Sequence, residues 1–463
     1  RSAGDRADDF HEIYAAYSAE KAAEQAARCS QCGVPFCQNH CPLQNNIPDW
    51  LRLVAEGDMQ SAYAVSSATN AMPEVCGRIC PQDRLCEGSC VIEQSGHGTV
   101  TIGAVETYIT ETAWSEGWVP PIAPAVERSE SVGVVGAGPA GLVAAEKLRD
   151  EGFQVTVYDR YDRAGGLLIY GIPGFKLEKH VVARRAERLE QGGVKFALGW
   201  TLGVDGSLAD LRAKHDAVLI ACGVYKAREL DGPVGAEAGV VRALDFLTAS
   251  NRKGLGDAVP EFDDGRLDAR GKRVVVIGGG DTAMDCVRTA VRQGAKSVTC
   301  LYRRDRANMP GSAREVANAE EEGVVFEWLA GPKAVLADKG AASAVRAVRM
   351  RLGPPDASGR RAPEETPGSE FNVPADLVVK ALGFEPDEAA ALFGAETPEL
   401  TRRGTLKVDP KTLETSLSDV YAAGDIVRGA SLVVWAVRDG QVAAAVMAAR
   451  LKAGAGANAM AAE

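Results

Sequence analysis

Eight of the 11 cysteines are concentrated in two groups in the first 90 residues. Residues 29–42 have the spacing Cys-x2-Cys-x4-Cys-x3-Cys-Pro, and residues 76–90 read Cys-x3-Cys-Pro-x4-Cys-x3-Cys. Disulfide frameworks are typical of small secreted domains, and structural zinc prefers paired Cys-x2-Cys knuckles, a spacing that only Cys29 and Cys32 have. Compact runs of cysteines with a distant fourth thiolate, and Cys followed by Pro, are typical of iron–sulfur ligands. The pattern therefore favours iron–sulfur clusters over disulfides or zinc.

The segments around these cysteines have helical periodicity. Apolar residues recur at helical intervals over residues 47–67 and again over about 101–116. Pro120, Pro121 and Pro124 then interrupt the pattern. We therefore expect a small helical domain whose core is partly replaced by clusters, followed by a linker.

A glycine-rich loop follows a short apolar strand at residues 131–135 and opens a predicted helix. The loop consists of Gly136, Ala137, Gly138, Pro139, Ala140 and Gly141. In a dinucleotide-binding unit the first glycine permits a tight turn, the second lets backbone amides approach the pyrophosphate, and the third lets helix and strand pack closely. The next strand ends at Asp159, where a carboxylate can accept the ribose hydroxyls. These residues predict a first nucleotide site.

A second strand–loop–helix unit begins near residue 272. After the strand at residues 274–277, its loop consists of Gly278, Gly279, Gly280, Asp281, Thr282 and Ala283. The following strand ends in Arg303 and Arg304, where an NAD site would place an acid. Guanidinium groups bind a 2′-phosphate through charge-assisted hydrogen bonds, whereas a carboxylate would repel it. We therefore predict NADPH at this unit; a solvated basic turn is the alternative interpretation.

Three further segments favour FAD in the first unit. Gly165, Gly166 and Leu167 follow Asp159 closely, as in flavoproteins where this loop covers the cofactor. A strand near residue 420 runs into Gly424 and Asp425, and a helix is expected from about Ser431. In two-dinucleotide flavoproteins such an Asp hydrogen-bonds the ribityl chain, and the positive end of the helix stabilises the reduced flavin.

Two short apolar segments, residues 219–223 and 378–383, end in small residues and mark where the chain enters and leaves an inserted domain. The second contains Ala381 and Gly383, which we assign to the NADPH site. The predicted fold class is α/β: an N-terminal helical iron–sulfur domain, then a split FAD-binding Rossmann-like domain with an inserted NADPH-binding Rossmann-like domain. The predicted boundaries are 1–125 for the helical domain, 126–228 and 382–463 for the FAD-binding domain, and 229–381 for the NADPH-binding domain.

Composition restricts the partners and the location. The formal charge of −11 and a pI near 5.2 argue against nucleic acid or an anionic membrane surface. No apolar run approaches the ~18 residues of a membrane span, and no secretion signal is present, so we expect a cytoplasmic protein. Cys286 is alone near the second glycine loop, which argues against a thioredoxin-reductase-like cysteine pair; it, Cys222 and Cys300 are expected in the core.

Together these motifs resemble the small subunits of bacterial NADPH-dependent glutamate synthases over essentially the whole chain, and the N-terminal half is similar to the electron-input region of dihydropyrimidine dehydrogenase. The segments that carry the resemblance are residues 29–37, 76–90, 170–177, 278–286, 302–306 and 422–431. Residues 170–177 include Lys176, which we assign to the FAD site on this resemblance.

The resemblance implies two 4Fe–4S clusters whose ligands cross between the cysteine groups. One cluster would use Cys29, Cys32, Cys37 and Cys90, and the other Cys41, Cys80, Cys86 and Glu106. The relative has a glutamine at the position of Glu106. The count of cysteines alone would instead supply Cys76 as the eighth ligand, because the two groups hold eight thiols. The crossing pattern does not use Cys76, so we favour Glu106.

The resemblance also implies the reaction. NADPH would reduce FAD by hydride transfer, which needs positioning and no catalytic acid or base from the protein. Electrons would then leave singly through the clusters to a large subunit that carries FMN and its own iron–sulfur cluster and makes glutamate from glutamine and 2-oxoglutarate. The alternatives are the same module serving a pyrimidine-reducing or ferredoxin-linked enzyme, or a non-catalytic nucleotide-binding scaffold with zinc.

Overall fold

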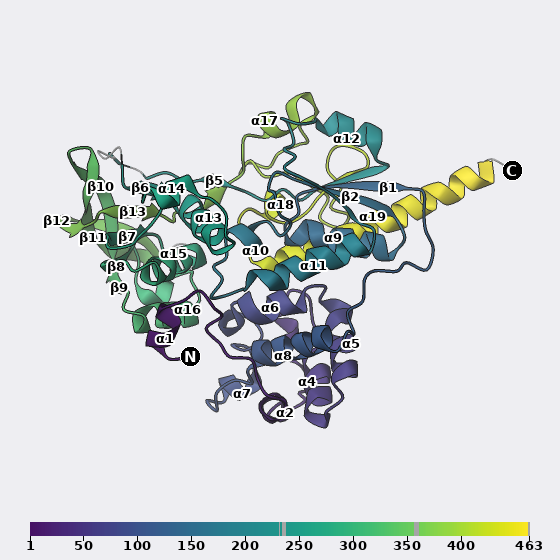
Figure 1. Cartoon of the computed structure of the whole chain (residues 1–463), viewed down its shortest axis with the longest axis horizontal. Helices are drawn as coiled ribbons and strands as arrows, with labels where there is room; N and C mark the ends of the chain where they lie inside the picture. Colours follow the sequence, from purple (N-terminus) through teal and green to yellow (C-terminus); the bar gives the residue numbers. More distant parts are fainter. Residues whose placement is uncertain (231, 234–237, 356–360, 462–463) are drawn as a thin grey trace. The chain divides into compact units, whose positions relative to one another are not determined.

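The computed structural model describes residues 1–230, 232–233, 238–355 and 361–461, and the chain forms two compact units (Figure 1). Unit 1 consists of Arg1–Ala15, Tyr170–Glu178 and Ala227–Gly383, and unit 2 of Ala16–Ile169, Lys179–Lys226 and Phe384–Glu463. The cysteine-rich segment and the first glycine loop therefore share unit 2. The first 15 residues instead join the second glycine loop in unit 1.

The cysteine-rich part of unit 2 is helical, as its periodicity predicts. Its elements are α2 (Ala19–Ala27), α3 (Phe36–Asn39), α4 (Ile47–Glu56), α5 (Met59–Thr69), α6 (Pro73–Ile79), η1 (Gln82–Arg84), α7 (Val91–Gln94) and α8 (Ile102–Ser115). Trp50, Val105 and Ile109 are fully buried at its centre, and five of the clustered cysteines pack against this core. None of the described helices combines the length and hydropathy that a bilayer span requires.

The predicted helical stretch over residues 47–67 is divided in two. Helix α4 ends at Glu56, Gly57 takes a left-handed conformation, and Asp58 caps α5 by accepting a hydrogen bond from the Ser61 backbone amide. A left-handed glycine commonly ends a helix, and a side-chain N-cap begins one. Gly57 and Asp58 therefore divide the stretch into two helices although its apolar spacing is continuous.

The second part of unit 2 is a parallel five-stranded sheet in the order β15-β4-β1-β2-β3. Its strands are β1 (Ser131–Val135), β2 (Gln154–Asp159), β3 (Lys195–Leu198), β4 (Ala217–Ile220) and β15 (Val420–Ala422). The helices around it are α9 (Pro139–Asp150), α10 (Leu167–Tyr170), α11 (Lys179–Gln191), α12 (Leu208–Lys214), α17 (Ala389–Phe393), α18 (Asp425–Arg428) and α19 (Val433–Ala461). The strand from the last third of the chain thus completes the sheet that the first nucleotide unit begins.

Register brings the predicted site residues of this sheet to one edge. Val135 at the end of β1 lies beside Tyr158 in β2 and Ile220 in β4, and Ile220 lies beside Ala422 in β15. Because all these strands are parallel, the residues that follow them emerge at the same carboxyl edge, where open α/β sheets bind their ligands.

Unit 1 holds the second parallel sheet, in the order β6-β13-β7-β8-β9. Its strands are β6 (Val240–Arg242), β7 (Arg273–Ile277), β8 (Ser297–Tyr302), β9 (Val325–Trp328) and β13 (Leu377–Lys380), and its helices are α1 (Ala3–Ala7), α13 (Ala243–Gly254), α14 (Pro260–Asp263), α15 (Asp281–Arg292), η2 (Arg306–Asn308) and α16 (Ala313–Glu321). Ile277 lies beside both Leu301 and Lys380, so the second glycine loop, the arginine pair and residues 381–383 also share one edge.

An antiparallel sheet that the sequence patterns do not predict is also part of unit 1. It is formed by β10 (Ala330–Asp338), β11 (Ala341–Pro355) and β12 (Arg361–Pro374). Strand β12 is an edge strand that contains proline and glycine, which disfavour strands in sequence patterns but are tolerated where one side needs no ladder bonds.

Buried ion pairs join the two parts of unit 2. The Arg185 guanidinium in α11 donates to both Glu74 oxygens in α6 at 2.8 Å, and it also contacts Glu146 in α9. The Glu74 side chain is 0% exposed and that of Arg185 is 4% exposed. Helix α6, which carries Cys76, is therefore fixed to the helices that cover the parallel sheet.

We expect Glu74→Ala to destabilise unit 2 by about 3 kcal/mol, because it leaves the buried Arg185 without its bidentate partner. Arg52→Ala is the control: its ion pair with Glu56 is exposed, so its loss should cost less than about 0.5 kcal/mol. Urea unfolding followed by tryptophan fluorescence measures both, and equal midpoints for the two variants would contradict the role of the buried pair.

Candidate cofactor sites

Two cavities in the helical part of unit 2 are lined by cysteines. The first has Cys29, Cys32, Cys37 and Cys90 in its wall. Cys29, Cys32 and Cys37 come from the first cysteine group and Cys90 from the second. Pro48 and several apolar side chains complete the wall.

The second cavity is lined by the remaining clustered thiols. The side chains in its wall that could be ligands are Cys41, Cys76, Cys80, Cys86 and Glu106. Ile102, the first residue of α8, lines both cavities and so separates them. Val434, the second residue of α19, also lines the second cavity.

All 11 cysteines are free thiols, so no disulfide framework is present. Burial raises the pKa of Cys37 to about 12 and that of Cys41 to about 11. Such thiols remain protonated at neutral pH unless a metal centre replaces the proton. Among the described residues, no three Cys, His, Asp or Glu side chains converge closely enough to hold one metal ion. Each cavity wall carries at least four side chains that can bind iron, which is the number of ligands that a 4Fe–4S cluster takes.

Glu106 is held in place by side chains from three neighbouring segments. Asn45 and Asn70 donate amide hydrogen bonds to its Oε1 atom at 3.0 and 3.1 Å, and the Ser66 hydroxyl donates to the same atom at 3.5 Å. Its side chain is buried, and burial raises its pKa to about 8. Cys76 lies on the same cavity wall, and a hydrogen bond with Cys80 and burial raise its pKa.

The first glycine loop has the packing that its sequence requires. Gly136 has a φ of +112°, and a Cβ atom there would lie 2.3 Å from the Ala221 carbonyl oxygen. A Cβ at Gly141 would lie 1.9 Å from the Gly136 oxygen, whereas one at Gly138 would meet nothing within 4 Å. Gly136 and Gly141 are therefore required for the packing of the chain, whereas Gly138 faces open space.

Asp159 and Gly166 complete the surroundings of this loop. The Asp159 carboxylate accepts hydrogen bonds from the Ala137 amide at 2.6 Å and the Tyr161 amide at 2.8 Å, so it holds the glycine loop in place. Burial raises its pKa. A Cβ at Gly166 would lie 2.9 Å from the Gly138 Cα atom, so the segment that begins α10 with Leu167 lies against the loop.

The Gly-Asp segment near the C-terminus lies at the same edge. Gly424 follows β15, and a Cβ there would lie 3.1 Å from that of Ala140, next to Pro139 at the start of α9. Asp425 accepts a hydrogen bond from the Ser431 hydroxyl at 2.6 Å, and burial raises the pKa of its carboxyl to about 6. The helix expected from about Ser431 begins at Val433.

The second glycine loop repeats these features in unit 1. Gly278 has a φ of +147°, and a Cβ there would lie 2.2 Å from the Ala381 carbonyl oxygen, whereas Gly280 faces open space. Asp281 begins α15 and accepts a hydrogen bond from the Ser312 amide at 3.0 Å. Its neighbours Thr282 and Ala283 continue the helix, and Gly383 ends the segment that follows β13.

The arginine pair follows β8 in unit 1. Arg303 is exposed, and Arg304 is half-buried. The buried Nε atom of Arg304 has no hydrogen-bond partner among the described residues. A partly buried guanidinium with an unfilled donor, beside a glycine loop, fits an anion such as the 2′-phosphate of NADPH.

Lys176 belongs to unit 1, where its ammonium donates to Asp285 at 2.9 Å and is 3.6 Å from a Glu315 oxygen. The residues that sequence reasoning missed are the amides of Asn45 and Asn70, the separator Ile102, and Val434. No local motif marks them, because each acts through a neighbour far away in the sequence.

Comparison with known proteins identifies the family. Residues 6–118 match the family model described as dihydropyrimidine dehydrogenase domain II, 4Fe–4S cluster, and residues 130–440 match that of pyridine nucleotide-disulphide oxidoreductases. The chain is 62% identical over 453 residues to the glutamate synthase (NADPH) small chain of Azospirillum brasilense, covering 98% of this chain and 94% of that one. This chain belongs to the glutamate synthase (NADPH) small-chain family.

One further relative is similar in sequence, and one solved structure is similar in fold. The small chain of Escherichia coli is 46% identical over 441 residues, covering 94% of this chain and 93% of that one. Among solved structures, Mycobacterium tuberculosis FprA in complex with NADPH has a TM-score of 0.58 and 23% identity, covering 71% of this chain and 86% of that one. The predicted fold class is confirmed: a small-chain family member has a 4Fe–4S domain followed by an FAD- and NADPH-binding reductase fold.

We expect Gly141→Ala and Gly138→Ala to separate packing from cofactor binding. Gly141→Ala should destabilise the FAD-free protein by about 3 kcal/mol, because its Cβ would overlap backbone. Gly138→Ala should leave that stability nearly unchanged but weaken FAD retention, because its Cβ would occupy the open approach to the loop. Urea unfolding of the deflavinated protein and flavin absorbance after gel filtration measure the two effects. Full FAD retention by Gly138→Ala would contradict this assignment.

Proposed function

We propose that this chain oxidises NADPH in unit 1, collects the electrons at FAD in unit 2 and delivers them singly to a larger partner subunit. The observation that carries the proposal is the continuity of unit 2. The Gly424-Asp425 segment leads through α18 into α19, whose residue Val434 lines the second cysteine cavity. Further along the same helix, the Gln441 amide donates to the Thr69 carbonyl oxygen of the helical part at 3.1 Å. One helix thus connects the candidate flavin edge with a candidate cluster cavity.

When bound, FAD accepts a hydride and releases electrons one at a time, and 4Fe–4S clusters carry single electrons. The chain's own residues bind and orient these groups. Around FAD we assign the first glycine loop, the ribose acid and the segments that meet them at the sheet edge: Gly136, Gly138, Pro139, Ala140, Gly141, Asp159, Gly166, Leu167, Gly424, Asp425 and Ser431. The assignment of Lys176 to the FAD site on the family resemblance stays a prediction; its ammonium pairs with Asp285 within unit 1.

Around NADPH we assign residues that share the edge of the unit 1 sheet: Gly278, Gly280, Asp281, Thr282, Ala283, Arg303, Arg304, Ala381 and Gly383. The amides at the start of α15 would bind the pyrophosphate of NADPH, and the two guanidinium groups would bind its 2′-phosphate.

For the clusters we assign the four cysteines of the first cavity to one 4Fe–4S cluster, and Cys41, Cys80, Cys86 and Glu106 to a second. All the hydrogen bonds described for Glu106 end on Oε1. That anchoring orients the carboxylate and leaves Oε2 for iron. A carboxylate ligand adds negative charge to the site and so shifts the reduction potential of the cluster.

The partner we propose is the large glutamate synthase subunit, with FMN and its own iron–sulfur cluster, which makes glutamate from glutamine and 2-oxoglutarate in the cytoplasm. This is supported by the small-chain family to which the chain belongs. No second function has a specific observation in its favour.

We expect Glu106→Ala to alter the EPR signal of one reduced cluster and to leave the other unchanged, because only the second cavity loses a ligand. Cys76→Ala is the matched control, since Cys76 lies on the same wall, and it should leave both signals intact. The reverse result would assign Cys76 as the ligand.

The function is tested on anaerobically purified protein, which should contain iron, labile sulfide and FAD and lose flavin absorbance when NADPH is added. Changing Arg303 and Arg304 to Gln should raise the NADPH KM between about ten- and a hundredfold per arginine, since each loses a charged hydrogen bond, while the NADH KM changes little. Arg306→Gln is the control, because Arg306 lies nearby on η2 but pairs with Glu320. Equal effects on both nucleotides would contradict the phosphate role, and a colourless protein would refute the function.

A further inference from the structure

The chain passes between the two units more often than an inserted domain requires. A simple insertion needs two crossings, but five are present, after residues 15, 169, 178, 226 and 383. The additional crossings come from two short segments of unit 1: the N-terminal strap, residues 1–15, and the docking loop, residues 170–178. Both are continuous in sequence with unit 2 and pack within unit 1.

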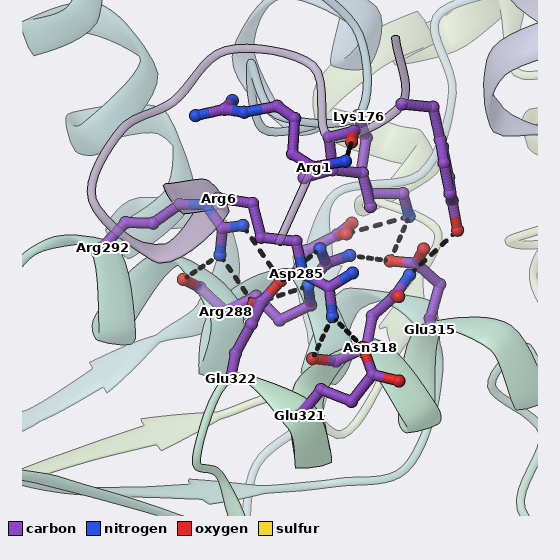
Figure 2. A network of polar contacts seen from close by, with 12 residues as sticks. Arg1, Arg6, Lys176, Asp285, Arg288, Arg292, Glu315, Asn318, Glu321 and Glu322 are labelled. Carbon is purple, nitrogen blue, oxygen red and sulfur yellow. Dashed lines mark hydrogen bonds and ion pairs between the residues drawn. The ribbon is translucent and has the colours of Figure 1, made fainter. Parts of the chain in front are cut away.

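The strap is attached to the nucleotide-binding unit mainly through Arg6 (Figure 2). The Arg6 side chain is 7% exposed; its Nε atom is 3.0 Å from a Glu322 oxygen, and it also pairs with Glu321. Its Nη2 atom donates to the Asn318 carbonyl oxygen at 3.4 Å. A neutral contact adds to these, since the Asn318 amide donates to the Tyr14 hydroxyl at 3.2 Å. The strap is therefore fixed to α16 and the residue that follows it.

The docking loop is attached through Phe175 and Lys176. The Phe175 ring is fully buried, with the guanidinium groups of Arg292 and Arg288 at 3.9 and 4.7 Å from its centre. Lys176 pairs with Asp285 of α15. The strap and the loop also bind each other, because the Ile13 amide donates to the Phe175 carbonyl oxygen at 3.1 Å.

The attachments form one buried network around α15. Arg288 donates to both Glu315 and Glu322, and Arg292 donates to Glu322 (Figure 2). The side chains of Arg288 and Glu322 are 0% exposed. Helix α15 is also the helix that the second glycine loop opens, so the strap and the loop are fastened to the element that would hold the NADPH pyrophosphate.

We propose that the strap and the docking loop position the nucleotide-binding unit for hydride transfer, with Arg6 and Lys176 as positioning residues. This inference rests on the proposed function. A domain joined by two connections moves as a hinge, and each further anchored connection restricts that motion. Hydride transfer requires close alignment of the nicotinamide with its acceptor, and a misplacement of ~1 Å can cost a hundredfold in rate.

Arg6→Gln tests the proposal. We expect faster proteolysis within residues 1–18 and a limiting rate of flavin reduction by NADPH that falls at least about tenfold, with the NADPH Kd and FAD content unchanged. Arg6→Lys should restore much of the rate. Arg1→Gln is the control: it removes the same charge from the same strap, but the hydrogen bonds of Arg1 end on residues 5–13.

Glu321→Gln keeps the test valid if Arg6→Gln does not fold. The Glu321 side chain is 60% exposed, and its loss leaves Arg6 paired with Glu322, so no buried charge is stranded. It should show a smaller fall in the same rate. A loosened strap with an unchanged limiting rate, or a strap that Arg6→Gln does not loosen, overturns the inference. If NADPH fails to reduce the wild-type flavin, the proposed function fails instead.

Discussion

One backbone contact is repeated in both parallel sheets, where each nucleotide loop begins and beside a segment that leads to a crossing between the units. In unit 2 the first glycine packs on the carbonyl oxygen of Ala221, which directly follows β4; in unit 1 it packs on that of Ala381, which directly follows β13. No side chain fits at either glycine. The same two segments lead the chain out of and back into the flavin-binding fold. The contact between this glycine and the carbonyl oxygen therefore holds two features at once. One is the turn that exposes the loop to a pyrophosphate, and the other is the segment that continues to the next domain.

The helical part of unit 2 depends on a different constraint. Two cavities in its interior are lined by the clustered thiols instead of by apolar side chains alone, and burial raises the pKa values of Cys37 and Cys41 among them. The apolar residues that remain, among them Trp50 and Ile109, pack around the cavities. Metal binding in such a domain contributes folding free energy as well as redox chemistry. The bidentate pair of Glu74 and Arg185 holds α6 from outside, which fixes one wall of the second cavity independently of any cluster.

The local parts of this architecture could be predicted from the sequence. Both glycine loops, the strands that precede them and the acid or arginines that end the next strand are encoded within about 30 residues, so their spacing is informative. The division of the cysteines between the two cavities came from a family resemblance, because eight thiols allow many pairings. The break at Gly57 and the strand β12 were missed because a local signal contradicted the periodicity. Arg6 and Asn45 were missed because their partners lie elsewhere in the sequence, Glu322 in one case and Glu106 in the other.

The buried ion pairs of unit 1 are better explained by the fixed geometry that they give to the strap and the docking loop than by a gain in folding free energy. Burying ions such as Arg288 and Glu322 has a large desolvation cost, and well-packed apolar side chains of similar volume often stabilise a fold as well or better. Apolar contacts, however, tolerate sliding, whereas bidentate and charge-assisted hydrogen bonds fix both distance and direction. A strap that only had to cover α16 could be apolar. A strap that has to set the position of a nucleotide-binding helix gains from the directional bonds of Arg6 and Lys176. The Phe175 ring, which contacts the guanidinium groups of Arg288 and Arg292, fixes the docking loop in the same way.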